Sequence, residues 1–177
     1  MMYDELREFA APIQLHCENC QLDGLISSVW DDMAVHPLHR DATLKLSSHR
    51  CMTYVDRMRI GQVFRNLFEN TLSACTPPIE LDVHCKCGQW RGRKMVRVTI
   101  TDNGPGFSPQ QREQAFEPFY TTKCEGTGLG LAISRRIVDL HDGRISIQSS
   151  STQGAEIEIL LPAPEGNAPC CIEAESE

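Results

Sequence analysis

Residues 56–75 read DRMRIGQVFRNLFENTLSAC, and this stretch decides the fold. Its apolar side chains recur every three or four positions, which is the spacing of one face of an α-helix. Two prolines, Pro77 and Pro78, follow, and proline ends a helix. We therefore predict one long amphipathic helix whose apolar face consists of Ile60, Val63, Phe64, Leu67, Phe68, Leu72 and Cys75.

The opposite face of this helix carries the polar residues Gln62, Asn66, Glu69, Asn70 and Ser73. Asn66 and Asn70 are four positions apart, so their side chains stand one above the other on adjacent turns. Two neutral amides in this arrangement can hold a hydrated Mg²⁺ and phosphate oxygens without adding negative charge beside an anionic ligand. A solvated helix face is the alternative that this segment alone leaves open.

Alternating apolar and polar residues after the prolines predict the strands of a sheet with one wet face. The first run is Ile79, Leu81, Val83, Cys85 and Cys87, and the second, across a Gly-rich turn, is Val96, Val98 and Ile100. Helical spacing returns at Ile133, Ile137, Val138 and Leu140. Two further alternating strands are predicted at residues 145–147 and 155–161.

Upstream of the long helix, the pattern is more varied. Residues 3–11 read as the end of a helix that stops near Pro12. A second amphipathic helix is predicted from Leu22, Leu25, Ile26, Val29 and Met33, with Asp23 as its candidate cap. Residues 43–46 and 51–55 are interpreted as two short strands, joined into a hairpin by the turn at residues 47–50.

A glycine-bearing segment, DNGPGF at residues 102–107, follows directly from a predicted strand. Gly104 and Gly106 allow the backbone to turn sharply and to approach a flat ligand closely. Asp102, at the strand end, can accept a hydrogen bond from an exocyclic amine such as that of adenine. An ordinary turn is the alternative.

A second glycine-rich segment, GTGLGL at residues 126–131, leads into the helix predicted at residues 132–140. Alternate glycines before a helix expose backbone N–H groups, and the helix N-terminus adds positive partial charge, so phosphate oxygens fit there. The segment matches neither the P-loop pattern nor the dinucleotide fingerprint.

Residues 116–123, FEPFYTTK, lie between the two glycine segments. The aromatic side chains of Phe116 and Phe119 suit a lid that packs down once a ligand is bound. A loop that the two phenylalanines anchor in the core is the alternative.

Composition excludes several classes of protein. The chain of 177 residues fits one domain, and its 24 acidic against 17 basic residues argue against binding to a nucleic acid backbone. No apolar run approaches the ~18 residues of a membrane span, and the N-terminus lacks the features of a signal peptide. A cytoplasmic location is therefore expected, which leaves open a membrane anchor elsewhere in a longer protein.

The nine cysteines are odd in number and scattered, so free thiols are expected rather than a disulfide framework. A zinc site is the less favoured alternative. Cys17, Cys20, Cys85 and Cys87 supply four possible ligands, but their spacing is unlike that of the usual zinc motifs.

Taken together, residues 66–70, 102–107, 116–123 and 126–131 resemble the N, G1, F and G2 boxes of the histidine kinase catalytic domain, in that order. The resemblance continues into residues 141–145 and 154–162. It implies an α/β two-layer sandwich of the Bergerat ATP-binding type, with a mixed β-sheet and helices packed on one face. It assigns residues 20–162 to this domain, residues 1–19 to the end of a dimerisation and phosphoacceptor helix with its linker, and residues 163–177 to a disordered acidic tail.

The resemblance also implies ATP and Mg²⁺ as ligands, with Asn66 and Asn70 as catalytic residues. Asn70 corresponds to the Mg²⁺ ligand and Asn66 to a phosphate or metal contact. Asp102 corresponds to the adenine anchor, and Gly104 and Gly106 to the turn beside the base. The other implied nucleotide-binding residues are Phe116 and Phe119 of the lid, Lys123 near the terminal phosphate, and Gly126, Thr127, Gly128, Leu129, Gly130 and Leu131 of the phosphate loop.

The function that the resemblance implies is donation of the γ-phosphoryl group of ATP to a histidine on an upstream helical dimerisation domain that lies outside this chain. A homodimeric parent and a downstream response regulator are the implied partners. His141-Asp142, the only histidine followed by an acidic residue, is interpreted as structural.

Two other functions stay open. An ATPase of the gyrase type, or a serine kinase of the anti-sigma type, is disfavoured because such ATPases place a water-activating Glu where Asn66 stands. A nucleotide-binding module used only for docking is the second.

Overall fold

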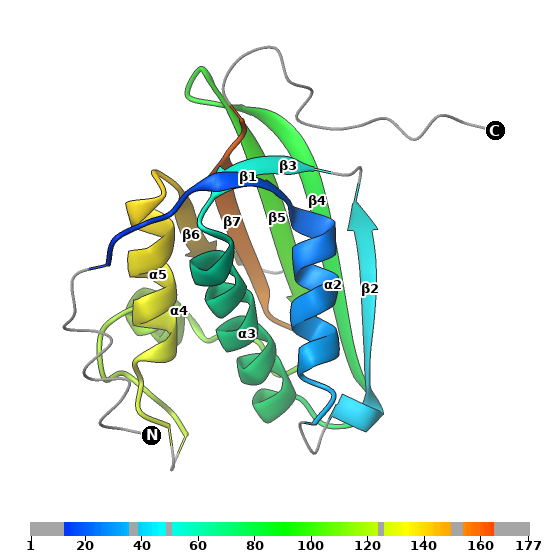
Figure 1. The fold of residues 1–177 in the computed structure, drawn as a ribbon. Coiled ribbons are helices and arrows are strands. Elements are labelled where there is room, and N and C mark those ends of the chain that lie inside the picture. Colours follow the sequence, from blue (N-terminus) through cyan, green and yellow to red (C-terminus); the bar gives the residue numbers. More distant parts are fainter. Residues whose placement is uncertain (1–12, 36–38, 49–50, 124–125, 150–153, 165–177) are drawn as a thin grey trace.

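The computed structural model describes residues 13–35, 39–48, 51–123, 126–149 and 154–164. These residues form two layers, a five-stranded mixed sheet and a layer of helices on one of its faces (Figure 1). The predicted two-layer α/β architecture is confirmed. Within the described residues, no helix is long and apolar enough to cross a membrane.

The sheet has the strand order β2-β4-β5-β7-β6. Its members are β2 (Ala42–Ser48), β4 (Ile79–Trp90), β5 (Arg93–Asp102), β7 (Glu156–Pro162) and β6 (Arg144–Ile147). β2 runs parallel to β4, and the other neighbours are antiparallel. The β4–β5 hairpin turns at Arg91 and Gly92, which both have positive φ, as a two-residue turn with matching twist requires.

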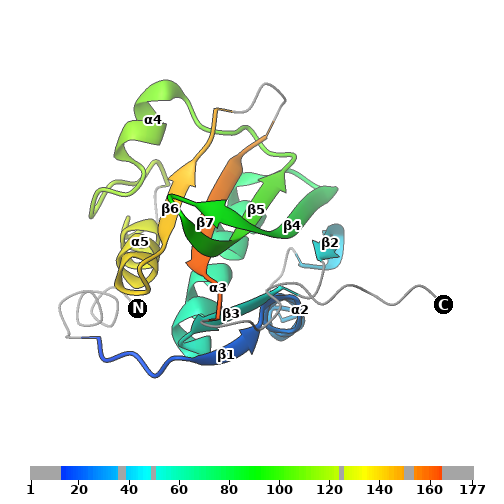
Figure 2. The same cartoon turned by 90° about the horizontal axis from the view of Figure 1, so that it is seen from above.

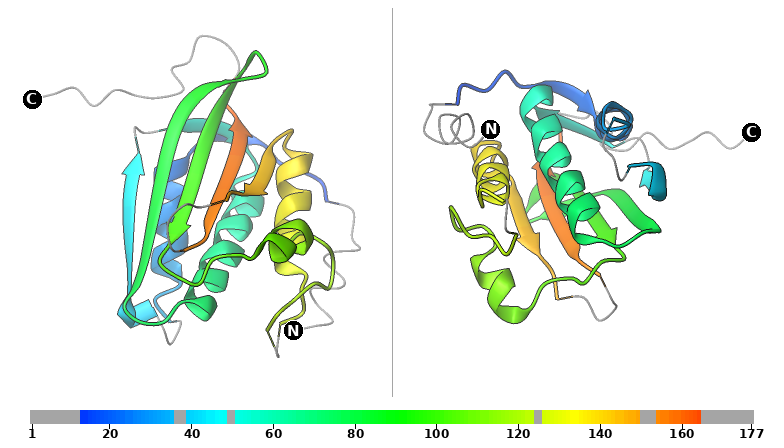
Figure 3. Two further views of the ribbon diagram at one scale, coloured as in Figure 1. Left: turned by 180° about the vertical axis from the view of Figure 1, so that it is seen from behind. Right: turned by 90° about the horizontal axis from the view of Figure 1, so that it is seen from below.

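The helix layer consists of α2 (Leu22–Asp32), α3 (Arg57–Ala74) and α5 (Gly130–Leu140). Seen from above, the three helices lie on one side of the sheet (Figure 2), and the view from behind shows the strands on the other face (Figure 3). α3 buries its apolar stripe completely, and each such side chain contributes about 1.5 to 3 kcal/mol to stability. The three predicted helices and the two pairs of alternating strands are confirmed.

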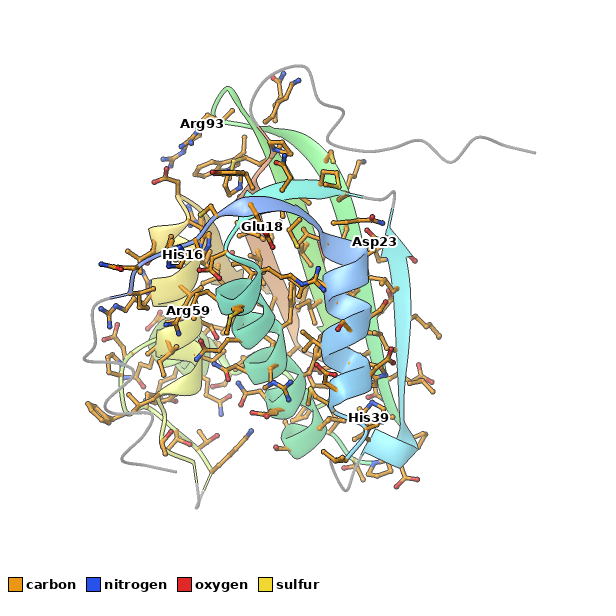
Figure 4. The ribbon with its side chains drawn as sticks, viewed as in Figure 1. His16, Glu18, Asp23, His39, Arg59 and Arg93 are labelled. Atoms are coloured by element: carbon orange, nitrogen blue, oxygen red, sulfur yellow. The ribbon has the colours of Figure 1, made fainter. Side chains whose placement is uncertain are left out.

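Asp56 joins three parts of the chain at the N-terminus of α3. Its Oδ1 accepts a hydrogen bond from the Arg59 backbone N–H at 3.1 Å, which caps the helix, and its Oδ2 accepts from the His16 N–H at 2.9 Å. Figure 4 shows His16 and Arg59 at this same end of α3. Burial alone would raise the pKa of Asp56, but the backbone donors outweigh it and hold the pKa below its ordinary value.

His141 completes this junction from the end of α5. Its Nε2 accepts a hydrogen bond from the Asp56 backbone N–H at 2.9 Å, and its Nδ1 lies 2.7 Å from the Ile137 carbonyl oxygen. Because Nε2 accepts a hydrogen bond and a carbonyl can only accept, Nδ1 carries the proton and donates to the Ile137 carbonyl. His141 therefore has a structural role, as the sequence predicts.

The predicted hairpin of residues 43–46 and 51–55 is wrong. Both strands exist, but β2 pairs with β4, whereas β3 (Met52–Val55) pairs antiparallel with β1 (Glu18–Gln21) in a separate two-stranded sheet. β1 was not predicted, because only one of its four residues is buried. An alternating pattern indicates a strand but not its partner, which here lies far away in the sequence.

Asp23 is not the cap of α2, which is a second correction. Gln21 occupies the capping position without a side-chain hydrogen bond, and Asp23 lies inside the first turn. The Asp23 carboxylate instead accepts a hydrogen bond from Gln21 Nε2 at 2.8 Å. The helix dipole favours an acidic residue in the first turn as well as at the capping position. The residue type alone therefore does not tell which of these two positions Asp23 occupies.

The expectation that the cysteines are free thiols is met only in part. Cys17, Cys20 and Cys75 are free thiols, whereas Cys87 is disulfide-bonded. Spacing along the chain does not report which sulfur atoms meet in space, so the sequence could not predict this bond. Among the described residues, no group of three His, Cys, Asp or Glu side chains is placed to hold a metal ion.

The predicted helix at residues 3–11 lies outside the described residues, as do residues 165–177 of the predicted tail. The division into residues 1–19, 20–162 and 163–177 stays a prediction.

We expect Asp56→Ala to lower the free energy of unfolding by about 1 to 2 kcal/mol at pH 7, because the helix loses its cap. Since the folded pKa of Asp56 lies below the unfolded value of about 4, this stabilisation is present above that pH and is lost as the pH falls through the folded pKa. Urea unfolding at pH 7 and pH 3 measures both effects.

Asp31→Ala is the control, because Asp31 is an exposed residue at the end of α2. It should change the free energy of unfolding by less than about 0.5 kcal/mol. A loss for Asp56→Ala that is as large at pH 3 as at pH 7 would contradict the role given to its charge.

Candidate functional site

A cavity of about 720 Å³ lies between α3 and the segment that leads into α5. Eight of the residues predicted from the sequence line it: Asn66, Asn70, Lys123, Gly126, Thr127, Gly128, Gly130 and Leu131. Residues from α3, from the turn after β5, from α4 (Pro109–Gln114) and from the lid segment (residues 116–123) complete the wall, among them Gln62, Glu69, Ser73, Phe107, Gln111, Tyr120, Thr121 and Thr122. Segments that are distant in the sequence therefore meet around one space.

Asn66 ties α3 to the first turn of α5. Its Nδ2 donates to the Gly130 carbonyl oxygen at 3.2 Å and to Ser134 Oγ at 3.4 Å. Ser134 Oγ in turn donates to the same Gly130 carbonyl at 2.9 Å. The Asn66 amide nitrogen thus fixes the start of α5 against the helix that carries the polar face.

Asn70 faces a cation. Lys123 Nζ, from the lid segment, donates a hydrogen bond to Asn70 Oδ1 at 3.1 Å. Burial lowers the pKa of Lys123, and the nearby carboxylate of Glu69 acts in the opposite direction. The side-chain oxygen of Asn70 is therefore turned toward a positively charged group inside the cavity.

The start of α5 offers backbone donors to the cavity. Leu129 occupies the capping position and makes no side-chain cap, so the first-turn N–H groups have no partner from a capping side chain. These groups, together with the positive end of the helix dipole, suit an anion. The Leu129 side chain itself is fully buried in the core and does not line the cavity.

Gly128 holds the lid segment against the glycine-rich segment at residues 126–131, called the glycine loop below. Its carbonyl accepts a hydrogen bond from the Phe119 N–H at 3.0 Å, and its φ is +70°. A Cβ atom at this position would overlap the backbone of Phe119. Both the conformation and the close approach therefore require glycine.

Asp102 lies at the end of β5, beside the C-terminal turns of α3. Its Oδ1 accepts hydrogen bonds from the backbone N–H groups of Gly104 and Ala155, each at 3.0 Å. Its Oδ2 accepts from Thr71 Oγ1 at 3.1 Å. Thr71 directly follows Asn70 in the chain, so α3 contacts both the cavity and the Asp102 carboxylate.

Four predicted residues besides Leu129 and Asp102 lie away from the cavity wall. Gly104 and Gly106 form the turn after Asp102, where Gly106 approaches the backbone of Gly154. Phe116 packs partly on the core beneath the Arg135 guanidinium, 5.7 Å from its ring centre, whereas Phe119 is 61 % exposed. Of the two phenylalanines, only Phe116 anchors the segment.

Helix α4 was missed, although the sequence carries its signal. Ser108 and Gln111 form a capping box: Ser108 Oγ accepts from the Gln111 N–H, and Gln111 Oε1 accepts from the Ser108 N–H. Pro109 occupies the first helical position, which proline favours. Ser-Pro-Gln-Gln therefore indicates a helix start, and it also places Gln111 in the cavity wall.

A family model described as "Histidine kinase-, DNA gyrase B-, and HSP90-like ATPase" matches residues 55–165. The sensor histidine kinase ZraS of Salmonella typhimurium is 32 % identical over 160 residues, which cover 89 % of this chain and 34 % of that protein. The signal transduction histidine-protein kinase AtoS of Escherichia coli is 30 % identical over 167 residues, 92 % of this chain and 27 % of that protein. The chain thus spans about a third of the length of these relatives.

Solved structures agree in fold. The catalytic domain of histidine kinase ThkA superposes with a TM-score of 0.73 at 27 % identity, and covers 84 % of this chain and 96 % of that one. Full-length ShkA in complex with AMPPNP superposes with a TM-score of 0.76 at 26 % identity, over 94 % of this chain and 36 % of that one.

We expect Gly128→Ala to lower the free energy of unfolding by more than about 1 kcal/mol, because alanine resists a positive φ and its Cβ would meet the Phe119 backbone. Gly24→Ala is the matched control. Gly24 lies inside α2 with nothing within 4 Å of an added Cβ, so this change should stabilise by up to about 1 kcal/mol. Urea unfolding of both variants measures the difference, and equal effects would contradict the special geometry of Gly128.

Proposed function

The chain belongs to the family of histidine kinase-, DNA gyrase B- and HSP90-like ATPases, as the catalytic domain of a sensor histidine kinase, and from this premise we propose how its site works. ATP is its substrate. We propose that the domain binds ATP together with Mg²⁺ and supplies the γ-phosphoryl group to a histidine on an upstream helical domain of a longer parent protein.

One observation carries the proposal: a single helix, α3, contacts both the cavity beside the glycine loop and the Asp102 carboxylate. Its amides Asn66 and Asn70 line the cavity together with the glycine loop, and its Thr71 contacts Asp102. Asp102 suits the exocyclic amine of adenine because a carboxylate accepts hydrogen bonds only. The N-terminus of α5 suits the phosphates.

The residues of the cavity fit a magnesium ion. Asn70 Oδ1 already accepts from a cation, the ammonium of Lys123, so this oxygen is oriented as a ligand of a positive charge. Asn70 would hold the ion, with Asn66 as a second neutral oxygen donor, while phosphates and water supply the other ligands that Mg²⁺ prefers. When bound, the ion neutralises charge on the phosphate oxygens.

The protein's own contribution is positioning, since phosphoryl transfer needs little covalent chemistry from the enzyme. Asn66 keeps the start of α5 docked on α3, so the backbone N–H groups stay aimed at the cavity. Lys123 brings a second positive charge from the lid segment, which can move from Asn70 to a phosphate oxygen. Phe116 anchors the lid, while the exposed Phe119 is available to close over a bound nucleotide.

The partners of the parent protein are part of the proposal. The phosphoacceptor histidine is the nucleophile, and we place it on a dimerisation domain upstream of this chain. We propose that the parent is a homodimer that passes the phosphoryl group to a response regulator, and that this domain works in the cytoplasm even where the parent is membrane-anchored.

A hydrolytic ATPase is the second candidate, favoured by one observation. Glu69 lines the cavity and could activate a water molecule, as carboxylates do in related ATPases. However, the Glu69 carboxylate already interacts electrostatically with the Lys123 ammonium. Turnover of ATP that Glu69→Gln abolishes, without any phosphoacceptor present, would favour this alternative.

We expect Asp102→Asn to weaken ATP binding by about 10- to 100-fold, because the new amide keeps an oxygen for the Gly104 and Ala155 donors but turns an NH₂ group toward the adenine amine. Asn70→Ala should instead remove most of the Mg²⁺ dependence. Calorimetric titration with ATP, with and without Mg²⁺, measures both. Lys45→Ala, an exposed residue of β2, is the control and should bind as the wild type does.

Phosphotransfer itself is tested with the upstream helical domain of the parent protein. Addition of this chain and Mg²⁺·ATP should phosphorylate a histidine there, as acid-labile, base-stable radiolabel. ATP binding by the wild-type chain without any transfer would leave a docking module as the better description, and no ATP binding by the folded chain would overturn the proposed function.

A further inference from the structure

The Asp102 carboxylate lies against two side chains, Thr71 and Cys75, to which the proposed function gives no role in nucleotide selection. We propose that Thr71 and Cys75 are positioning residues, which orient this carboxylate toward the 6-amino group of an adenine nucleotide and so set the preference for adenine over other purines. This inference rests on the proposed function, because it assumes that the purine binds beside Asp102.

Thr71 fixes the second oxygen of the carboxylate. The first oxygen, Oδ1, accepts hydrogen bonds from two backbone N–H groups. These bonds fix the position of Oδ1 but still allow the carboxylate to rotate about it. Thr71 Oγ1 donates to Oδ2 at 3.1 Å, and its side chain is buried. With both oxygens held, the plane of the carboxylate is fixed, and so is the direction in which Oδ2 accepts a further hydrogen bond.

Cys75 lies four residues after Thr71 and therefore on the same face of α3. Its thiol is buried and lies close enough to the Asp102 carboxylate for the two groups to interact electrostatically. Burial, with the charge of Asp102, raises the pKa of the thiol to about 11. At neutral pH the group is therefore an S–H donor and adds no second negative charge beside the carboxylate.

Cys75 also fills the space that Gly104 leaves open. A Cβ atom at position 104 would lie 2.6 Å from Cys75 Sγ and 3.0 Å from Asp102 Oδ1. The absence of a side chain at Gly104 thus lets the thiol approach the carboxylate and the turn at the same time. Thr71 of α3, Cys75 at its C-terminal cap and the turn after β5 therefore all lie against Asp102.

A fixed carboxylate discriminates between purines by the group at position 6. Adenine presents an amino donor there, whereas guanine presents a carbonyl acceptor, which a carboxylate repels. A purine with only hydrogen at position 6 leaves the carboxylate without its partner. Sites built to bond a donor reject the analogue that lacks it. If Thr71 sets the direction of Oδ2, its loss should reduce this discrimination and leave the contacts to the triphosphate unchanged.

The test compares ATP with purine riboside triphosphate, which lacks only the 6-amino group, by calorimetric titration of the wild type and Thr71→Val. Valine has the shape of threonine without its hydroxyl. We expect the wild type to prefer ATP, and Thr71→Val to bind ATP about tenfold more weakly while its affinity for the amine-free analogue changes by less than about twofold. Thr71→Ser keeps the hydroxyl and should restore the wild-type ratio.

Cys75→Ala should lower the same ratio less, by about threefold, because a thiol is a weak donor. Equal weakening of both nucleotides by Thr71→Val, or an unchanged ratio, would overturn the positioning role while the proposed function stands. A wild type that binds neither nucleotide would overturn the proposed function and this inference together.

Discussion

The structure depends most on one acidic group, the half-buried Asp102 carboxylate at the end of the central strand β5. It accepts hydrogen bonds from α3 through Thr71, from its own turn through Gly104, and from the start of β7 through Ala155. A half-buried carboxylate has lost part of its contact with water, so these hydrogen bonds compensate it and hold the three segments together. The helix layer and the sheet are thus joined at the carboxylate that we propose as the adenine contact.

The sequence could predict those features that local spacing encodes. The stripe of α3 and the alternation of β4 and β5 are each strong periodic signals, since burial on one face repeats with the period of the element. The polar amides, the DNGPGF turn and the glycine loop follow one another along the chain. Taken as a set, their order could be compared with that in a known family. Of the predicted site residues, those of α3 and all of the glycine loop except Leu129 line one cavity, because both segments belong to regular elements or their ends.

The features that could not be predicted depend on contacts between distant segments. β2 and β3 were found as strands but given the wrong partners, because alternation in each strand is the same whichever neighbour it pairs with. Thr71 carries no signal of its contact with Asp102, since threonine on a helix face is ordinary. Leu129 sits within a glycine motif, yet its side chain belongs to the core. Local sequence does not distinguish a side chain that lines the cavity from one that packs in the core.

The contacts around the site also close very long segments of chain. The bond from Ala155 to Asp102 spans 53 residues and that from Asn66 to Gly130 spans 64. The bond from Asp56 to His141, at the N-terminus of the same helix α3, spans 85. Such non-local contacts form late and slow the folding of a domain. The complete site therefore exists only in the folded domain, and a ligand that requires it has no affinity for the unfolded chain. Its binding free energy is added in full to global stability, by RT ln(1 + [L]/Kd), so that the cellular nucleotide pool helps to protect this domain from unfolding and proteolysis.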